Sequence, residues 1–426
     1  MDESMATFRY DDMEVLSRGF PWSSSDFISG EEENLALLLE FEREFASQVH
    51  TGPPHWWGLD DALADPENLR MAMDIQVAYI KNYQLDRADA VARYALAAAK
   101  QRGLPWNVKA LQDAATLRMK QDRQVEAAVL LEEINDLVPP HPIHHKNLGT
   151  CYNSLKQHQR ALEHFQEAVR LKDGEMDHSD RWDIGIAKKN LKEFDDAAQL
   201  LVDALEGSRK DRGDPVELAK LHDSVGGCYL EMGEHYRKEC QYANWAEPHF
   251  RESERLFREA VGTGSPLWQG AVKLLSTSLR LQGKYGEAVP WLREGIRVEA
   301  EKDSIHPTPL HDMIEDLSWL AERGALENRP QYHELFERAL QNLKRAGRGG
   351  DGNAGMVMHK VARFLMLSGP EYRPSALLYL QEALQLIRHH DEEVDLSGHC
   401  ALLEIEIHFC EMLLKDNMLA ICDGKC

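Results

Sequence analysis

Apolar residues recur at the spacing of an α-helix along most of this chain. From Arg70 onward, Leu and Ala return every three or four residues, and Pro stands mainly at the breaks between such stretches. No long window shows the two-residue alternation that is typical of a half-buried β-strand. Because the helical stretches are short and come in pairs, the pattern predicts an all-α chain built from repeated helix pairs.

The clearest repeated unit covers residues 142–175. Two small residues, Gly149 and Ala161, stand where the helices of a pair would touch, and the rings of Tyr152 and Phe165 would fill the space around that contact. Weaker copies of this pattern occur 34 residues earlier and 36 residues later. The spacing therefore predicts a row of similar helix pairs that bury their apolar faces against one another.

These residues and their spacing resemble the tetratricopeptide repeat, a helix–turn–helix unit of 34 residues. The resemblance covers roughly residues 70–390 and is most specific over 108–300. It implies an all-α, right-handed superhelical α-solenoid in which the first helix of each pair lines a concave surface. Proteins of this kind generally bind extended peptides or helices on that surface and serve as scaffolds.

Three regions are expected along the chain. Residues 1–69 form an acidic N-terminal extension, partly ordered, with one amphipathic helix over 31–48. Residues 70–395 form a tetratricopeptide-repeat solenoid of about eight helix pairs, with an insertion near 234–245 that puts Phe257 in the place equivalent to Phe165. Residues 396–426 form a C-terminal capping helix and tail.

The charge of the chain is strongly negative and unevenly distributed. Asp and Glu number 72 against 49 Lys and Arg, which gives a formal net charge of −23. Residues 1–69 alone hold sixteen acidic residues and three Arg, a net charge of −13. This charge disfavours general binding to nucleic acid or to an anionic membrane surface.

Several features bear on the compartment of the protein. No apolar run approaches the ~18 residues needed to span a bilayer, so no membrane insertion is expected. The acidic start does not resemble a secretory or organellar presequence. The seven cysteines are too few and too scattered for a disulfide framework. Together these features predict a cytoplasmic protein.

Motifs for catalysis and cofactor binding are absent from the sequence. It contains neither a phosphate-binding GxxxxGK[ST] loop, nor a strand-linked GxGxxG motif, nor an HExxH zinc motif. The histidines within 141–145 are interpreted as a turn between repeats, and Cys422 and Cys426 as part of a tail, because neither set supplies the further ligands that a metal site needs. We therefore expect no enzyme activity, no metal and no cofactor.

The first helices supply the sharper functional clue. In the tetratricopeptide family, positions 2, 5, 9, 12 and 13 of the first helix face the concave side. Mapped onto six units, these thirty positions hold nine basic and two acidic residues, whereas the average composition of the chain gives about 3.5 and 5.1. A partly desolvated basic surface attracts carboxylates and speeds their encounter. The mapping predicts a basic groove in an otherwise acidic protein.

The leading hypothesis is a non-catalytic protein–protein interaction adaptor that binds an acidic peptide segment in this groove. Basic side chains would attract carboxylates, and two carboxamides and an indole would add hydrogen bonds and an apolar anchor. The residues expected to bind the peptide are Lys109, Lys120, Lys146, Asn153, Trp182, Lys189, Asn190, Lys220, Lys273 and Arg280. The carboxylate clamp by which family members hold the acidic C-terminus of cytosolic chaperones is not expected, because Thr150 and Asp183 stand where that clamp needs Asn.

Two other arrangements are compatible with the sequence. In the first, residues 1–69 occupy the groove of their own chain and are displaced by a partner. In the second, the chain is a structural subunit of a large multiprotein assembly and makes permanent contacts through its convex face and the 234–245 insertion. An obligate subunit should aggregate or degrade alone, whereas an adaptor should be a soluble monomer.

Overall fold

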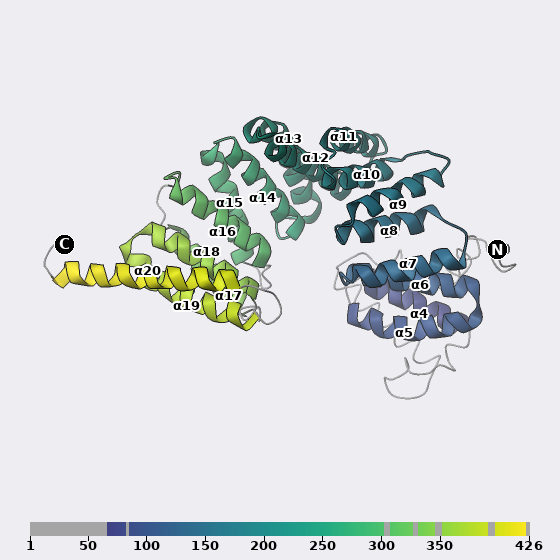
Figure 1. Cartoon of the computed structure of the whole chain (residues 1–426), viewed down its shortest axis with the longest axis horizontal. Helices are drawn as coiled ribbons and strands as arrows, with labels where there is room; N and C mark the ends of the chain where they lie inside the picture. The colour runs from purple at the N-terminus through teal and green to yellow at the C-terminus, as the bar shows by residue number, and fades with distance from the viewer. Residues whose placement is uncertain are drawn as a thin grey trace. The chain divides into compact units, whose positions relative to one another are not determined.

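The computed structural model describes residues 66–81, 85–301, 307–326, 331–345, 352–390 and 397–422 (Figure 1). All regular structure in these residues is helical, so the all-α class predicted from the sequence is confirmed. No helix among them combines the length and the apolarity needed to cross a membrane. The predicted helix over 31–48 lies outside the described residues.

The chain divides into two compact units, Met1–Leu200 and Leu201–Cys426. The helices of the first unit are α4 (Pro66–Lys81), α5 (Leu85–Arg102), α6 (Leu104–Lys120), α7 (Gln124–Leu137), α8 (Pro142–Ser154), α9 (His158–Arg170), α10 (His178–Asn190) and the start of α11 (Phe194–Lys210).

The second unit contains the rest of α11 and all later helices. These are α12 (Pro215–Tyr236), α13 (Glu239–Val261), α14 (Pro266–Leu281), α15 (Tyr285–Ala300), α16 (Pro307–Glu322), α17 (Gln331–Arg345), α18 (Gly352–Ser368), the 3₁₀ helix η3 (Pro370–Tyr372), α19 (Arg373–His390) and α20 (Ser397–Cys422).

Within each unit, helices pack mainly on their neighbours in the chain. In the first unit, each helix from α4 to α9 contacts the next one, and α4 also contacts α6. In the second unit, each helix from α12 to α15 contacts the next one, α14 contacts α16, α16 contacts α18, and α15 contacts α17. Successive first helices therefore contact one another within each unit, as α4 does α6 and α14 does α16, and this is expected for a stack of helix pairs.

Glycines on the first helices allow the helices of a pair to approach closely. A Cβ atom added at Gly149 of α8 would lie 2.5 Å from the ring of Phe165 on α9. One added at Gly226 of α12 would lie 2.6 Å from the ring of Phe250 on α13. Both rings are buried. The contact predicted for Gly149 and Phe165 is present, and the second unit repeats it.

The turns within four helix pairs share one backbone conformation. Asp122, Lys156 and Lys192 have φ angles of 60°, 59° and 67°, and each stands two residues before the second helix of its pair. Gly283, with φ 76°, holds the same place before α15. This left-handed conformation is the one that glycine adopts without strain. The shared turn makes each of these pairs a helix–turn–helix unit.

Helices α12 and α13 form the longest hairpin of the second unit. They have 22 and 23 residues, whereas α8 and α9 have 13 each. The insertion expected near 234–245 falls at the end of α12 and the start of α13, so its residues lengthen both helices. The expected place of Phe257 is wrong: Phe250 packs on Gly226, and Phe257 packs with Trp268 of α14.

Candidate peptide-binding surface

The predicted residues of the first unit lie on α6, α8 and α10. Side-chain bonds join α8 to α10 at two places. Lys146 Nζ donates to Ser179 Oγ at 2.7 Å and lies 3.1 Å from Asp183 Oδ2. Asn190 Nδ2 donates to Asn153 Oδ1 at 2.9 Å. The structure therefore brings Lys146, Asn153 and Asn190 together on one surface of α8 and α10.

The carboxamide pair of this surface retains hydrogen-bonding capacity. Asn153 Oδ1 also lies 2.9 Å from Nδ1 of His158, which donates to it from the start of α9. These bonds use Asn153 Oδ1 and Asn190 Nδ2. Asn153 Nδ2 and Asn190 Oδ1 are not committed by them, so together they offer a donor and an acceptor suited to a peptide main chain.

The lysines of the first unit face carboxylates of their own chain. Lys109 Nζ lies 2.5 Å from Asp113 on the same helix, and Lys146 is paired with Asp183. Burial raises the pKa of Asp113 and of Asp183, and the paired lysine offsets part of that effect in each case. Burial likewise raises the pKa of Asp74 to about 6, with Lys109 opposing it.

The charge of this surface differs from the one calculated from the sequence. Asp74, Asp113 and Asp183 each stand one residue after a position used in that calculation, and they face the same surface as the lysines. The five family positions of each first helix do not include these carboxylates. Around Lys109 and Lys146, the surface is therefore charge-balanced.

The other two lysines of the first unit stand near helix ends. Lys120 is exposed at the end of α6, and Lys189 is half-buried next to Asn190 at the end of α10. Trp182 is half-buried one turn after the start of α10. Lys189 and Trp182 thus share α10 with Asn190, whereas Lys120 belongs to α6.

The remaining predicted residues belong to the second unit. Lys220 is exposed on α12. On α14, Lys273 is paired with Asp312 of α16, and Arg280 Nε lies 3.1 Å from Asp316 of the same helix. These two basic residues thus join successive first helices, as Lys146 does in the first unit.

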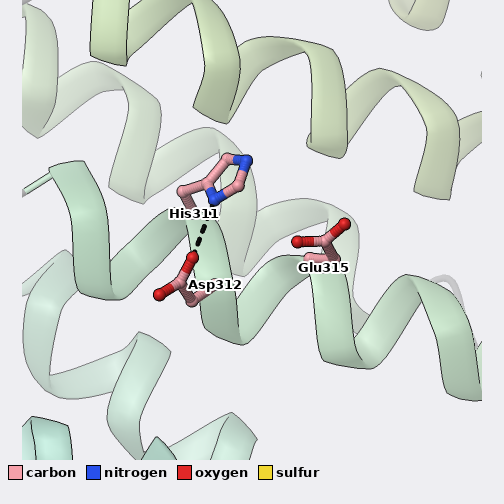
Figure 2. Close-up of side chains that lie close together, drawn as sticks. All are labelled: His311, Asp312 and Glu315. Atoms are coloured by element: carbon pink, nitrogen blue, oxygen red, sulfur yellow. Dashed lines mark hydrogen bonds and ion pairs between the residues drawn. The ribbon is translucent and has the colours of Figure 1, made fainter. Parts of the chain in front are cut away.

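A cluster that the sequence analysis did not identify lies on α16. Figure 2 shows His311, Asp312 and Glu315, whose possible ligand atoms all lie within 4.8 Å of one another. His311 Nδ1 is 2.9 Å from Asp312 Oδ1. Asp312 is paired with Lys273 of α14, and Glu315 lies 2.5 Å from Lys360 of α18. A cation would have to displace both lysines, so the cluster fits an ion-pair network between first helices better than a metal centre.

The histidines of residues 141–145 occupy the start of α8. His141 is the N-cap residue, and its Nδ1 accepts from the backbone N–H of Ile143 at 3.3 Å. His144 is buried, and burial lowers its pKa to about 4. His145 Nδ1 lies 3.0 Å from Nδ1 of His164 on α9. Their interpretation as a turn is therefore wrong, because two of these histidines pack within the helix pair.

A cavity of about 530 Å³ in the second unit is lined by residues of α15, of α17 and of the segment after α16, and none of them is a predicted binding residue. Its lining is mainly apolar, and the guanidinium of Arg297 at its edge is already bonded to Glu294 and Glu301. The lining residues are Gly286, Val289, Pro290, Arg293, Glu294, Arg297, Ala325, Leu326 and Tyr332.

Two geometric features decide the type of repeat. Glycine and phenylalanine meet between paired helices, and left-handed turn residues recur at Asp122, Lys156 and Lys192, which are 34 and 36 residues apart. The chain has the tetratricopeptide-repeat fold. The residues expected on the first helices of this fold lie on α6, α8, α10, α12 and α14.

Comparison with known proteins found similarity at the level of structure. No protein-family model and no curated protein matches the chain. Among solved structures, a Rap protein complexed with competence and sporulation factor is 15% identical, covers 91% of this chain and 99% of its own, and has a TM-score of 0.46. The apo form of RapI is 13% identical, with coverages of 84% and 99% and a TM-score of 0.48. A signal-transduction ATPase from Pyrococcus horikoshii with a tetratricopeptide-repeat sensor is 13% identical, with coverages of 88% and 55% and a TM-score of 0.49.

Proposed function

We propose that this tetratricopeptide-repeat protein is a non-catalytic adaptor that binds an acidic, extended peptide segment on the first helices of its first unit. The observation that carries the proposal is the polar surface of α8 and α10, where Lys146, Asn153 and Asn190 lie together. Carboxamides that join adjacent helices can form hydrogen bonds with a peptide main chain, and lysines beside them can form ion pairs with acidic side chains.

The ion pair at the centre of this surface is suited to exchange. Burial disfavours the charged form of Asp183, as the direction of its pKa shift indicates. A peptide carboxylate would replace Asp183 as the ion-pair partner of Lys146, and Asp183 could then bind a proton. Lys120 and Lys189 would attract further acidic side chains, and Trp182 would contact an apolar one. Lys109 would stay with Asp113, which is on its own helix.

The second unit would offer further contacts to an acidic partner. Lys220 is exposed, whereas Lys273 and Arg280 are engaged by Asp312 and Asp316. We therefore expect Lys220 to contribute more to binding than the other two. This ranking can be tested by replacing each of the three residues with Ala in turn.

The test begins with affinity purification and mass spectrometry of the full chain, followed by fluorescence anisotropy with a labelled acidic peptide from the partner that is recovered. Lys146→Glu combined with Lys189→Glu should weaken binding at least tenfold, because two attractive charges become repulsive. A matched control is Lys100→Glu with Lys210→Glu, which reverses two exposed lysines on the second helices α5 and α11.

The control variant should bind within about twofold of the unchanged protein, because both of its lysines lie on second helices and not on the first helices that form the proposed surface. Asn153→Ala with Asn190→Ala should weaken binding of the same peptide even when its acidic side chains are replaced by Gln, because the carboxamides contact the main chain. Equal affinity of the Lys146→Glu, Lys189→Glu variant and the unchanged protein would refute the proposed surface.

A structural subunit is a second candidate function, favoured by the α12–α13 hairpin. Two aromatic side chains near its turn, Tyr236 and Trp245, are 39% and 47% exposed. Tyr242 lies between them, with ring centroids 6.0 Å from Tyr236 and 4.8 Å from Trp245. Exposed clusters of Tyr and Trp are typical of interfaces. If Tyr236→Ala with Trp245→Ala removes all recovered partners while the Lys146→Glu, Lys189→Glu variant keeps them, this function is the better supported one.

A further inference from the structure

The last described helix, α20, carries an apolar stripe on its outer side. The exposed fractions of Leu402, Ile405, Phe409 and Met412 are 41%, 67%, 47% and 44%. Their spacing of three, four and three residues places them on one face of the helix. Single exposed apolar residues are common, but four on consecutive turns form a continuous surface.

The opposite side of α20 is already packed. Cys400, Leu403 and Cys410 are buried in the hydrophobic core of the second unit, and Ile407 and Leu414 pack against it. At 100° per residue, this inner face is nearly opposite the outer stripe. A terminal repeat normally turns a polar face to water. Helix α20 is apolar on both sides, so it fits an interface better than a cap.

Charge separates two possible occupants of the stripe. The predicted helix over 31–48 carries six Glu and one Arg, a net charge of −5. The rim of the stripe is itself balanced, because Glu404 is paired with Arg388 of α19 and Glu411 stands one turn before Lys415. A charge-balanced rim does not attract an acidic segment such as the 31–48 helix. The rim of a second copy of α20 is also balanced, so two copies can approach without net electrostatic repulsion.

The stripe is complementary to itself. Its spacing reads the same in both directions, so an antiparallel copy of α20 would place Leu402 opposite Met412 and Ile405 opposite Phe409. Such pairing has two-fold symmetry, in which each contact occurs twice. In this register, Arg388 beside Glu404 of one copy would come close to Glu411 of the other.

We propose that α20 is a self-association surface on which two copies of this chain pair antiparallel through Leu402, Ile405, Phe409 and Met412. This proposal is independent of the peptide-binding surface. Four side chains on one helix cover less than the roughly 800 Å² per partner of a standard interface. The dimer should therefore dissociate on dilution.

Sedimentation equilibrium of the full chain over a wide concentration range tests the proposal. The apparent mass should rise from 48.6 kDa towards twice that value as the concentration increases. Ile405→Glu with Phe409→Glu should remain monomeric throughout. Leu378→Glu should dimerise as the unchanged chain does, because it adds a single negative charge at an apolar residue of α19 that is 60% exposed and lies outside the stripe.

A mixing experiment tests the orientation of the two helices. Ile405→Lys alone and Phe409→Glu alone should each weaken the dimer, and an equimolar mixture should restore it, because antiparallel pairing puts Lys at 405 opposite Glu at 409. Circular dichroism of each variant checks that the fold is retained. A monomer at all concentrations, or a dimer that survives Ile405→Glu with Phe409→Glu, would overturn the proposal. Failure of the mixture to restore the dimer would overturn the antiparallel arrangement.

Discussion

Glycine residues decide how closely the helices of a pair approach. Gly226 and Gly227 are neighbours on α12, yet only Gly226 lies against the ring of Phe250, and the space around Gly227 is open. Glycine at the first position permits close packing, whereas at the second it only weakens the helix. The two neighbours therefore allow these effects to be measured separately.

Gly226→Ala should destabilise the protein by about 1–3 kcal/mol, because the added Cβ overlaps a buried ring in a packed core. Gly227→Ala should stabilise it by about 0.5–1 kcal/mol, because Ala is the better helix former and its methyl group meets open space. Urea unfolding followed by circular dichroism measures both free energies. Similar effects of the two substitutions would contradict the packing argument.

The carboxyl group of Asp223 on α12 makes the stability depend on pH. Burial raises its pKa from the ordinary 3.8 to about 7, and the neighbouring hydroxyl of Ser253 opposes this in part. Between about pH 4 and pH 7, the folded chain holds a proton there that the unfolded chain releases, so stability falls as the pH rises.

Asp223→Asn should therefore stabilise the protein by on the order of 1–3 kcal/mol at pH 8 and have little effect at pH 4. Asn keeps the shape of the protonated acid, so the difference reports the cost of the buried charge. Thermal unfolding of both proteins at the two pH values provides the measurement. If Asp223→Asn raised the thermal stability equally at both pH values, a buried charge at Asp223 could not be the cause.

Residues that act within a helix pair were easier to predict than residues that act between pairs. Phe165 beside Gly149 follows from a pattern inside one unit. The partners of Lys146 and Lys273 are Asp183 and Asp312, which lie 37 and 39 residues further along the chain. Such pairings depend on how successive first helices are rotated about their axes, and the hydrophobic pattern does not specify that rotation.

Helix α10 begins with a capping box. The side chain of Asp177 accepts from the backbone N–H of Asp180 at 2.8 Å, and the Asp180 side chain accepts from the backbone N–H of Asp177 at 3.2 Å. Lys172 Nζ lies 3.1 Å from Asp177 and 2.8 Å from Asp180. This capping box fixes the helix that carries Trp182 and Asn190 of the candidate surface.

Asp177→Ala should destabilise the protein by about 1 kcal/mol, whereas Asp177→Ser should retain most of the stability, because Ser can also cap the helix. Burial alone would raise the pKa of Asp177, but the Asp180 backbone and Lys172 outweigh it and lower the pKa. The cost of Asp177→Ala should therefore be full at pH 7 and shrink as the pH falls below the ordinary value of 3.8. Denaturant unfolding at pH 7 and pH 3 tests this; equal costs of Ala and Ser at pH 7 would exclude a capping role.

The α12–α13 hairpin shows the limit of sequence alignment at the scale of helices. Phe250 and Phe257 are seven residues apart, so both lie on one face of α13 and both match the repeat pattern. Which of them packs on Gly226 depends on where the chain turns. The extra residues extend both helices about the turn at Arg237, so they move the whole of α13 relative to the pattern.

For the molecule as a whole, the negative net charge opposes the approach of an acidic partner. The net charge is −23, and residues 1–65 contribute fifteen acidic side chains and three Arg, or −12. An acidic peptide therefore meets long-range repulsion before it reaches Lys146 or Lys189. The extension also remains a candidate occupant of the groove of its own chain.

Removal of residues 1–65 should raise the affinity for an acidic peptide several-fold at low salt, because most of the repulsive charge is lost. The salt dependence distinguishes two causes. If the extension only repels the peptide, the gain in affinity should vanish at high salt. If the extension occupies the groove, the gain should shrink but persist in part, because hydrogen bonds from Asn153 and Asn190 are not screened as ion pairs are. Anisotropy titrations at two ionic strengths measure this. If removal of residues 1–65 lowered the affinity at low salt or left it unchanged, neither repulsion by the extension nor occupation of the groove would be supported.

Packing between chain neighbours also bears on how this protein is made. Within each unit, the described helix pairs dock on their neighbours in the chain, so these pairs need not wait for a distant segment during synthesis. We expect the pairs to fold in order as they leave the ribosome. At each moment, the newest pair presents an apolar side that only its successor will cover. The tendency of a stalled chain to aggregate should therefore depend on the apolar side of the last pair that it has made, and not on the length of chain that is missing.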